Sequence, residues 1–359
     1  AEGCNDLYEG SYINDISDKI QEFIKNKGWN ITIKSILENN EHSKKLEACR
    51  KIIVNSILEN IRDSLGKLGI VFDDWFSESQ LFEKNLVDKT IARLKETGKT
   101  IKKDGALMFN DDEPRVLIKS NGEYTYFASD LAYHDKKMRE FDRVINIWGA
   151  DHHGYVNRVC KGLESLGHDI DKLDIHLIQF ANLYRGKEKV SMSTRKGEFV
   201  ELDTLLQEIG IDAINYFYLM RSKDQHLDFD LEVAVSSNKN NPVYYIQYAH
   251  ARIEKILSQV SNYREFEFDH KNLTNKHEGD LVDQLANFSD ICKKSIINLK
   301  PQIMTNYLYD LSQLFHGYYA SERIIKDKIN YSQVYLLAAI QKVVKCGLET
   351  INIQAPKEM

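Results

Sequence analysis

The sequence predicts a mixed α/β protein in which helices cover a parallel sheet, followed by an all-helical bundle. Up to residue 230, strand-like and helix-like segments alternate in units of about 30 residues, which is the rhythm of βαβ units. From residue 231 onward the β signal disappears. Apolar residues then recur at helical spacing, and two prolines stand where helices would begin.

The first expected elements are a long helix and the beginning of the sheet. Residues 50–69 place Ile53, Ile57, Ile61 and Leu65 on one helical face and end at glycines. Residues 70–76 (IVFDDWF) have the composition of a strand, residues 85–98 of a helix, and ALMFN, VLIKS and EYTYF of short strands. The Asn-Gly pair at 121–122 predicts a tight hairpin between the last two, because both residue types tolerate positive φ.

The next segments complete a βαβ unit. Ser129 is a candidate N-cap for a helix over DLAYHDKKM. The strand RVINIWG (143–149), a helix over about 153–166 and the strand LDIHLIQF (173–180) follow. Ligands of parallel sheets bind beyond the carboxyl ends of the strands, which is where ESQ, GADHHG and SMSTRKG fall.

The last third predicts helices only. Asn241 is a cap candidate and Pro242 occupies the first helical position, and the apolar face that follows consists of Val243, Ile246, His250, Ile253 and Leu257. Further helices are expected at 278–299, 301–326 and 332–347. We therefore divide the chain into a helical part (1–69), an α/β part (70–230) and a helical bundle (231–359).

Composition excludes several classes of protein. A chain of 359 residues with 42% hydrophobic and 28% charged residues indicates ordered domains rather than disorder. No apolar run approaches the roughly 20 residues of a membrane span, and no signal peptide is recognisable, so a cytoplasmic location is expected. Five scattered cysteines without C-x-x-C spacing argue against a disulfide framework or a zinc site. With a net charge of -6, a nucleic-acid partner would need a local basic patch.

The segment VSMSTRKGEFVEL (190–202) groups hydroxyl and cationic side chains in front of a glycine. Hydroxyls, backbone N–H groups and the cations Lys187, Lys189, Arg195 and Lys196 suit a polyphosphate, whose charge they would neutralise. The alternative is a solvated basic turn at the start of a helix.

The segment WGADHHGY (148–155) ends a strand and begins a helix. Gly149 would allow a ligand to approach the backbone, and Asp151 could accept hydrogen bonds from ligand hydroxyls. His152 and His153 suggest a metal site, as in the phosphoesterases named for an adjacent Asp-His-His, but the further aspartates of such sites are not apparent. The alternative is a helix N-cap with one buried histidine.

Two acids follow strand-like segments, Glu78 and Asp130, and Tyr126 lies one helical turn before Asp130. Carboxylates beside a tyrosine ring could bind a guanidinium or ammonium group through paired hydrogen bonds and ring stacking. Asp130 could equally serve only to cap a helix.

Taken together and in this order, eight segments resemble a bacterial arginyl-tRNA synthetase: YEGSYINDI, FDDWFSES, VLIKSNGEYTYFASDLAYH, VINIWGADHHGYVNRV, SMSTRKGEFVELDTLLQEIGIDA, YFYLMRS, HLDFDLE and NPVYYIQYAHARI. The resemblance covers nearly the whole chain. It implies the second half of a class I Rossmann-type catalytic domain, followed by an anticodon-binding bundle. It also implies a monomer without a membrane partner that activates arginine with ATP, as its Mg²⁺ complex, and transfers it to the 2′-hydroxyl of the terminal adenosine of tRNA.

By this resemblance, VSMSTRKG is similar to the Lys-Met-Ser-Lys-Ser signature loop that stabilises the leaving pyrophosphate. The two lysines of the signature are replaced here by Ser191 and Thr194, so another lysine would have to act in their place. The implied catalytic residues are Lys189, Ser191, Met192, Ser193 and Lys196.

The resemblance also implies three sets of binding residues and no resident metal. A guanidinium pocket would contain Glu78, Tyr126 and Asp130. ATP would contact Gly149, Ala150, Asp151 and His153. In the bundle, unstacked RNA bases and phosphates would meet Tyr244, Tyr245, Tyr248 and Arg252, unless these aromatic residues are simply part of the helical core.

The chain does not contain the His-Ile-Gly-His-like signature of class I synthetases or the N-terminal domain that binds the tRNA elbow. We therefore expect that it lacks half of an ATP site and does not charge tRNA by itself, an expectation that measurable arginine charging would contradict. Two alternatives stay open: a non-catalytic tRNA-binding module, and a metal-dependent Asp-His-His phosphodiesterase.

Overall fold

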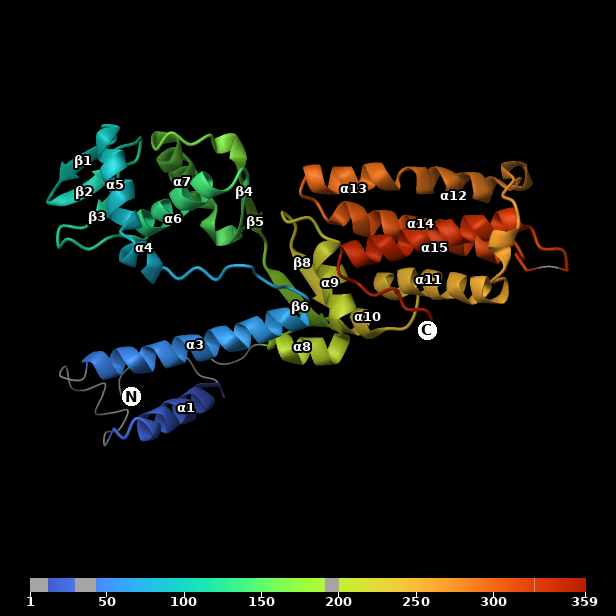
Figure 1. Cartoon of the computed structure of the whole chain (residues 1–359), viewed down its shortest axis with the longest axis horizontal. Coiled ribbons are helices and arrows are strands. Elements are labelled where there is room, and N and C mark those ends of the chain that lie inside the picture. The colour runs from blue at the N-terminus through green and yellow to red at the C-terminus, as the bar shows by residue number, and fades with distance from the viewer. Residues whose placement is uncertain (1–11, 30–42, 191–199, 326) are drawn as a thin grey trace. The chain divides into compact units, whose positions relative to one another are not determined.

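The computed structural model describes residues 12–29, 43–190, 200–325 and 327–359. Its internal contacts divide the chain into two units, here called the small unit (72–181 and 223–227) and the large unit (1–71, 182–222 and 228–359). Figure 1 labels their helices and strands. None of the helices in the described ranges has both the length and the apolar character to cross a membrane.

The small unit contains two sheets. Its elements are α4 (Ser79–Glu83), α5 (Leu86–Glu96), β1 (Thr100–Lys103), β2 (Ala106–Phe109), β3 (Arg115–Ile118), α6 (Tyr126–Glu140), β4 (Val144–Gly149), η2 (Ala150–His152), α7 (His153–Ser165), η3 (Ile170–Lys172) and β5 (Leu173–Ile178). Strands β1, β2 and β3 form an antiparallel sheet. Strands β4 and β5 pair in parallel, with α7 as their crossover helix, which confirms the predicted βαβ unit.

The core of the small unit lies where α5, α6 and α7 meet the strands. Leu94, Leu117, Leu131 and Leu163 are fully buried there. A Cβ atom added at Gly162 would lie 2.8 Å from a methyl group of Leu131, so a side chain at this position would push α7 away from α6. The glycine therefore allows the close contact of the two helices that carry most of the candidate site.

A buried carboxylate holds the same helices together. Asp135 of α6 is fully buried and accepts two hydrogen bonds from Arg93 of α5, at 2.6 and 2.9 Å. It also accepts bonds from Thr90, from Arg139 and, at 2.6 Å, from His168 after α7. Although burial raises the pKa of Asp135, the donors and the positive charges outweigh it, and the pKa stays below its usual value.

The large unit combines a helical pair, a small sheet and the predicted bundle. Its elements are α1 (Tyr12–Asn26), α3 (Ser43–Lys67), β6 (Ala181–Arg185), β7 (Glu188–Lys189), α8 (Leu202–Ile209), α9 (Ile211–Leu219), β8 (Leu227–Asp230), α10 (Leu231–Val235), α11 (Pro242–Gln259), α12 (Lys276–Ala286), α13 (Phe288–Ile297), α14 (Gln302–Ser321) and α15 (Tyr331–Thr350), with short 3₁₀ turns η4 (Tyr263–Glu265) and η5 (His270–Asn272). Helices α11 to α15 form the bundle (Figure 1), and Asn241 caps α11 as predicted.

The chain after α15 is fastened to the bundle by side chains. Gln247 of α11 donates to the carbonyl of Gln354 and to the carboxylate of Asp212, which itself accepts the N–H of Gln354. His250 bonds the carbonyl of Pro356 at 2.8 Å. These contacts fix residues 354–356 against α9 and α11.

Three expectations about the first elements were wrong. Residues 70–76 form no strand, because no neighbouring strand pairs with them, and Val71 is 82% exposed. Only Tyr124 of EYTYF pairs with a strand, at Ile118, before α6 begins at Tyr126. Ser129 lies inside α6 instead of capping it, because the helix already begins at Tyr126. The residue before the helix is Thr125, which has an extended backbone and donates its hydroxyl to the carbonyl of Val116.

Two expectations about long helices need correction. In α3, Ile57 and Ile61 of the predicted apolar face are 36% and 41% exposed, so helical spacing alone did not identify a buried face. The helix expected at 278–299 is divided at Asn287 into α12 and α13.

We predict that Asp135→Asn lowers the free energy of unfolding of the small unit by about 3 kcal/mol, because it removes the buried negative charge to which Arg93 and His168 both donate. Since the folded pKa is depressed, this contribution is present above about pH 4 and is lost as pH falls through the folded value. Hydrogen exchange of the α5 and α6 amides in urea measures it.

Asp174→Asn is the matched control, because Asp174 pairs with Arg143 on the surface and should contribute less than about 1 kcal/mol. Equal effects of the two substitutions would contradict the role assigned to Asp135.

Candidate functional site

The centre of the candidate site is the carboxylate of Asp130 on α6. The hydroxyl of Tyr155, from α7, donates to Oδ2 of Asp130 at 2.9 Å. Burial raises the pKa of Asp130, and the negative charge of Glu78 raises it further. The Tyr155 bond and the positive charges of His152 and Lys137 act in the opposite direction. A half-buried carboxylate with a raised pKa would be stabilised by a bound cation.

A series of hydrogen bonds between buried polar side chains begins at the backbone carbonyl of Asp130. His134 bonds the carbonyl of Asp130 through Nδ1 at 2.7 Å and meets the Asn146 amide through Nε2 at 2.8 Å. Burial lowers the pKa of His134 to about 4, so the ring is neutral and its Nδ1–H is the donor. Lys137 donates to Asn146 at 2.7 Å, and burial lowers the pKa of this lysine to about 8. These hydrogen bonds fix the backbone of α6 at Asp130 without adding a strong donor to its carboxylate.

The other two residues of the predicted guanidinium pocket, Glu78 and Tyr126, are both exposed and come from the starts of α4 and α6. Glu78 is exposed at the start of α4, near enough for its charge to act on Asp130. Tyr126 is the first residue of α6 and is 82% exposed. Glu78 and Asp130 together offer two carboxylates to a cation, and the exposed ring of Tyr126 is available for stacking.

The predicted ATP-contact residues follow β4. Gly149 ends this strand, and a Cβ atom there would lie 2.4 Å from Oδ1 of Asp151, so a larger residue would require the exposed Asp151 side chain to move. Ala150 and Asp151 form the 3₁₀ turn η2, and His153 begins α7. Asp151 and His153 are exposed at the carboxyl end of the strand, where ligands of parallel sheets bind.

Most of the predicted signature loop falls outside the described residues. This applies to Ser191, Met192, Ser193, Thr194 and Lys196. Lys189 is described and is exposed on β7, opposite Tyr184. Its role therefore stays a prediction.

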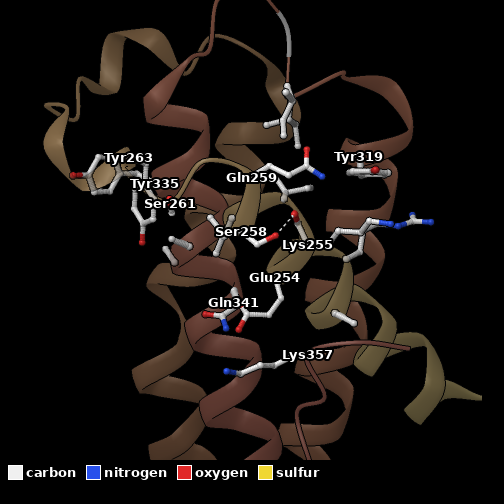
Figure 2. A pocket seen from close by; sticks show the side chains of 18 of the residues that line it. Glu254, Lys255, Ser258, Gln259, Ser261, Tyr263, Tyr319, Tyr335, Gln341 and Lys357 are labelled. Atoms are coloured by element: carbon white, nitrogen blue, oxygen red, sulfur yellow. Dashed lines mark hydrogen bonds between the residues drawn. The ribbon is translucent and has the colours of Figure 1, made fainter.

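A second candidate site is a large pocket in the bundle, with a volume of about 1850 Å³. Figure 2 shows Tyr263 and Tyr335 on one side of it, Tyr319 on the other, and Lys357 near one end. Its lining includes six cations and three acids, and the cations are Arg252, Lys255, Arg264, Arg323, Lys342 and Lys357. This local basic patch with aromatic rings is what the acidic chain would need to bind RNA.

Arg252 lies between two aromatic rings of this pocket. Its guanidinium carbon is 4.4 Å from the ring centre of Tyr248 and 4.5 Å from that of Tyr319. It also donates to the Tyr248 hydroxyl at 2.6 Å. Of the other predicted RNA contacts, Tyr244 stacks on Tyr248, whereas Tyr245 packs against Tyr309 and His316. Neither Tyr244 nor Tyr245 lines the pocket.

Sequence reasoning did not single out several residues of these sites. Tyr155 belongs to the segment GADHHGY, and its position in the first turn of a helix that follows a strand was a usable signal. Tyr319, Lys342 and Lys357 come from segments distant in sequence from α11, and nothing in their local pattern marks them as neighbours of Arg252.

Comparison with known proteins agrees with this architecture. The family described as "tRNA synthetases class I (R), catalytic domain" matches residues 11–225, which is more than half of the chain. The family described as "DALR anticodon binding domain" matches residues 246–359. The curated arginine–tRNA ligase of Desulfosudis oleivorans is 40% identical over 99% of the chain and 65% of its own length. That of Thioalkalivibrio sulfidiphilus is 44% identical over 85% of the chain and 55% of its own length.

A solved structure also resembles this chain. A Campylobacter jejuni protein described as a candidate arginyl-tRNA synthetase matches 100% of this chain and 78% of its own, with a TM-score of 0.86 and 27% identity. The parallel strand pair, the helical bundle and the two family matches place the chain among the class I aminoacyl-tRNA synthetases. The chain belongs to the arginyl-tRNA synthetase family of this class. It spans 55–65% of the length of the two curated relatives.

We predict that Tyr155→Phe raises the pKa of Asp130 further, because it removes a hydrogen bond that favours the charged carboxylate. Carboxyl ¹³C shifts followed as a function of pH measure this pKa. Tyr124→Phe should leave it unchanged, since that hydroxyl bonds Asp88. An unchanged or lowered pKa in Tyr155→Phe would show that this bond does not act on Asp130.

Proposed function

We propose that this protein acts in the ATP-dependent attachment of arginine to its tRNA, through an arginyl-adenylate. The observation that carries the proposal is the half-buried carboxylate of Asp130, whose charged form is disfavoured by burial and by Glu78. Such a group gains most from a ligand that brings its own positive charge and several N–H donors. The guanidinium of arginine meets both requirements.

The remaining residues suggest how the substrates would be held. The backbone at Gly149 and the carboxylate of Asp151 would meet the ribose of ATP, with Ala150 and His153 beside them. Lys189, together with Ser191, Met192, Ser193 and Lys196, would stabilise the pyrophosphate that leaves as its Mg²⁺ complex.

The bundle pocket suits unstacked bases of tRNA. Arg252 between two tyrosine rings offers a flat cationic surface for stacking, and the surrounding lysines and arginines would attract phosphates. A monomeric state, a cytoplasmic location and the lack of a membrane partner belong to this proposal as well.

The two alternative functions are less well supported. Within the described ranges, no three His, Cys, Asp or Glu side chains converge as a metal-dependent phosphodiesterase would need, and Asp151, His152 and His153 all lie exposed. A tRNA-binding module without catalysis would use the bundle pocket but would have no need of the Asp130 pocket. Arginine binding therefore separates it from a synthetase.

We predict that the 359-residue chain binds arginine more tightly than citrulline, the uncharged analogue of the same shape, and that Asp130→Asn removes the preference. Loss of one charge-assisted interaction weakens arginine binding by about tenfold to a hundredfold. Isothermal titration calorimetry measures both ligands. Asp174→Asn, which alters a surface carboxylate of the same unit, is the matched control. Equal binding of the two ligands would contradict the guanidinium pocket.

We predict that the chain prefers an arginine-accepting tRNA over a non-cognate tRNA by more than about tenfold, which is about 1.4 kcal/mol. Arg252→Ala should weaken binding of the cognate tRNA by about 1–3 kcal/mol, because a stacking and cationic contact is lost. Fluorescence anisotropy at one stated salt concentration measures this. Lys276→Ala removes the same charge from the exposed start of α12 and should have little effect. A chain without any tRNA preference would contradict the role of the bundle.

A further inference from the structure

A pocket of the small unit contains three cations that have no role in the function proposed so far. It has a volume of about 440 Å³ and is lined by β3, the first residues of α6 and the middle of α7. Three of its lining residues are cationic and none is acidic. The cations come from three different segments: Arg115 from β3, Lys119 from the turn after it, and Arg158 from α7.

Two of these cations have unused hydrogen-bond donors. The Nε groups of Arg115 and Arg158 are buried, and neither has an acceptor within the described residues. Buried polar groups are nearly always paired, so two orphaned guanidinium donors around one pocket indicate a missing acceptor. Within the part of the chain that the structure describes, Arg158 forms no ion pair, and its guanidinium carbon lies 5.9 Å from the centre of the Tyr155 ring.

The acids near the pocket would not prevent an anion from binding. Arg115 pairs with Glu113, and Lys119 pairs with Glu123. Both glutamates are largely exposed, with side-chain exposures of 75% and 63%. Exposed ion pairs contribute little free energy, so an anion in the pocket could replace or share these partners at low cost.

The pocket adjoins the candidate arginine site through shared residues. Tyr155 bonds Asp130 with its hydroxyl and supports Arg158 with its ring. Tyr126 lines the pocket and precedes Asp130 by one turn of α6. An anion in this pocket would therefore lie next to the place where arginine is proposed to bind.

We propose that the pocket of Arg115, Lys119 and Arg158 binds a phosphodiester near the 3′ end of the RNA that receives arginine. This inference rests on the proposed function, because esterification of a terminal ribose requires the last nucleotides of the RNA to reach the bound arginine. Guanidinium groups match phosphate oxygens with paired donors, and the exposed ring of Tyr126 offers a stacking surface to a neighbouring base.

The test compares an arginine-accepting tRNA with the same tRNA lacking its four 3′-terminal nucleotides. Affinities of the 359-residue chain are measured by fluorescence anisotropy over a range of NaCl concentrations. Arg158→Gln should weaken binding of the intact tRNA about three- to tenfold and lower the slope of log K against log salt by about one phosphate contact. It should not weaken binding of the shortened tRNA. Arg115→Gln should act in the same direction.

Arg143→Gln is the matched control, because it removes one positive charge from the small unit at a surface pair outside the pocket. Circular dichroism shows whether each variant is folded, and if Arg158→Gln is not, Arg115→Gln carries the comparison. Equal effects of the pocket variants on both tRNAs, or no effect on either, would overturn the proposal.

Competition experiments distinguish the 3′ end of the RNA from other anions that could bind in the pocket. If inorganic phosphate or polyglutamate binds in an Arg158-dependent manner while removal of the 3′ nucleotides changes nothing, the pocket serves another anion and the proposal fails. If only this inference is wrong, the preference for arginine tRNA and its dependence on Arg252 are still observed. Loss of all tRNA binding in the unaltered chain would overturn both this inference and the proposed function.

Discussion

The small unit depends on one buried charge, the carboxylate of Asp135. A fully buried carboxylate is tolerated only when donors replace its water, and Arg93, Thr90, Arg139 and His168 do so here. These donors come from α5, from α6 and from the segment after α7. The position of α6 between its two neighbours therefore follows from a requirement for charge compensation as well as from apolar packing.

The same helix carries a second carboxylate in the opposite electrostatic condition. The donors around Asp135 outweigh the cost of its burial, so its pKa is lowered. Asp130 accepts a hydrogen bond from one tyrosine hydroxyl, and its pKa is raised. The hydrogen-bonding capacity of Asp135 is used within the folded chain, where this carboxylate holds the helices together. The second carboxylate is left with unused acceptor capacity, which is the condition under which a cationic ligand contributes most.

The bundle provides a local basic surface in a chain whose net charge is -6. Six of its cations line one pocket, and residues 354–356 are held in place by Gln247, Asp212 and His250. Residues 357–359, which follow directly, line the pocket. Side chains from α11, α14, α15 and this final segment thereby meet around Arg252, although most of them are remote from it in sequence.

Local patterns in the sequence determined the βαβ unit, the Asn121-Gly122 turn, the cap of α11 and the family, because each depends on neighbouring residues or on motifs in fixed order. They also led to the prediction that Asp130 binds a cation, which stays a prediction, but they did not indicate the tyrosine that bonds it. Only the tertiary structure decided that residues 70–76 form no strand, that Ser129 is buried within α6, and that Arg115 and Arg158 share a pocket. These outcomes depend on which partners are available in space, and burial, pairing and pKa values are set by those partners rather than by local propensity.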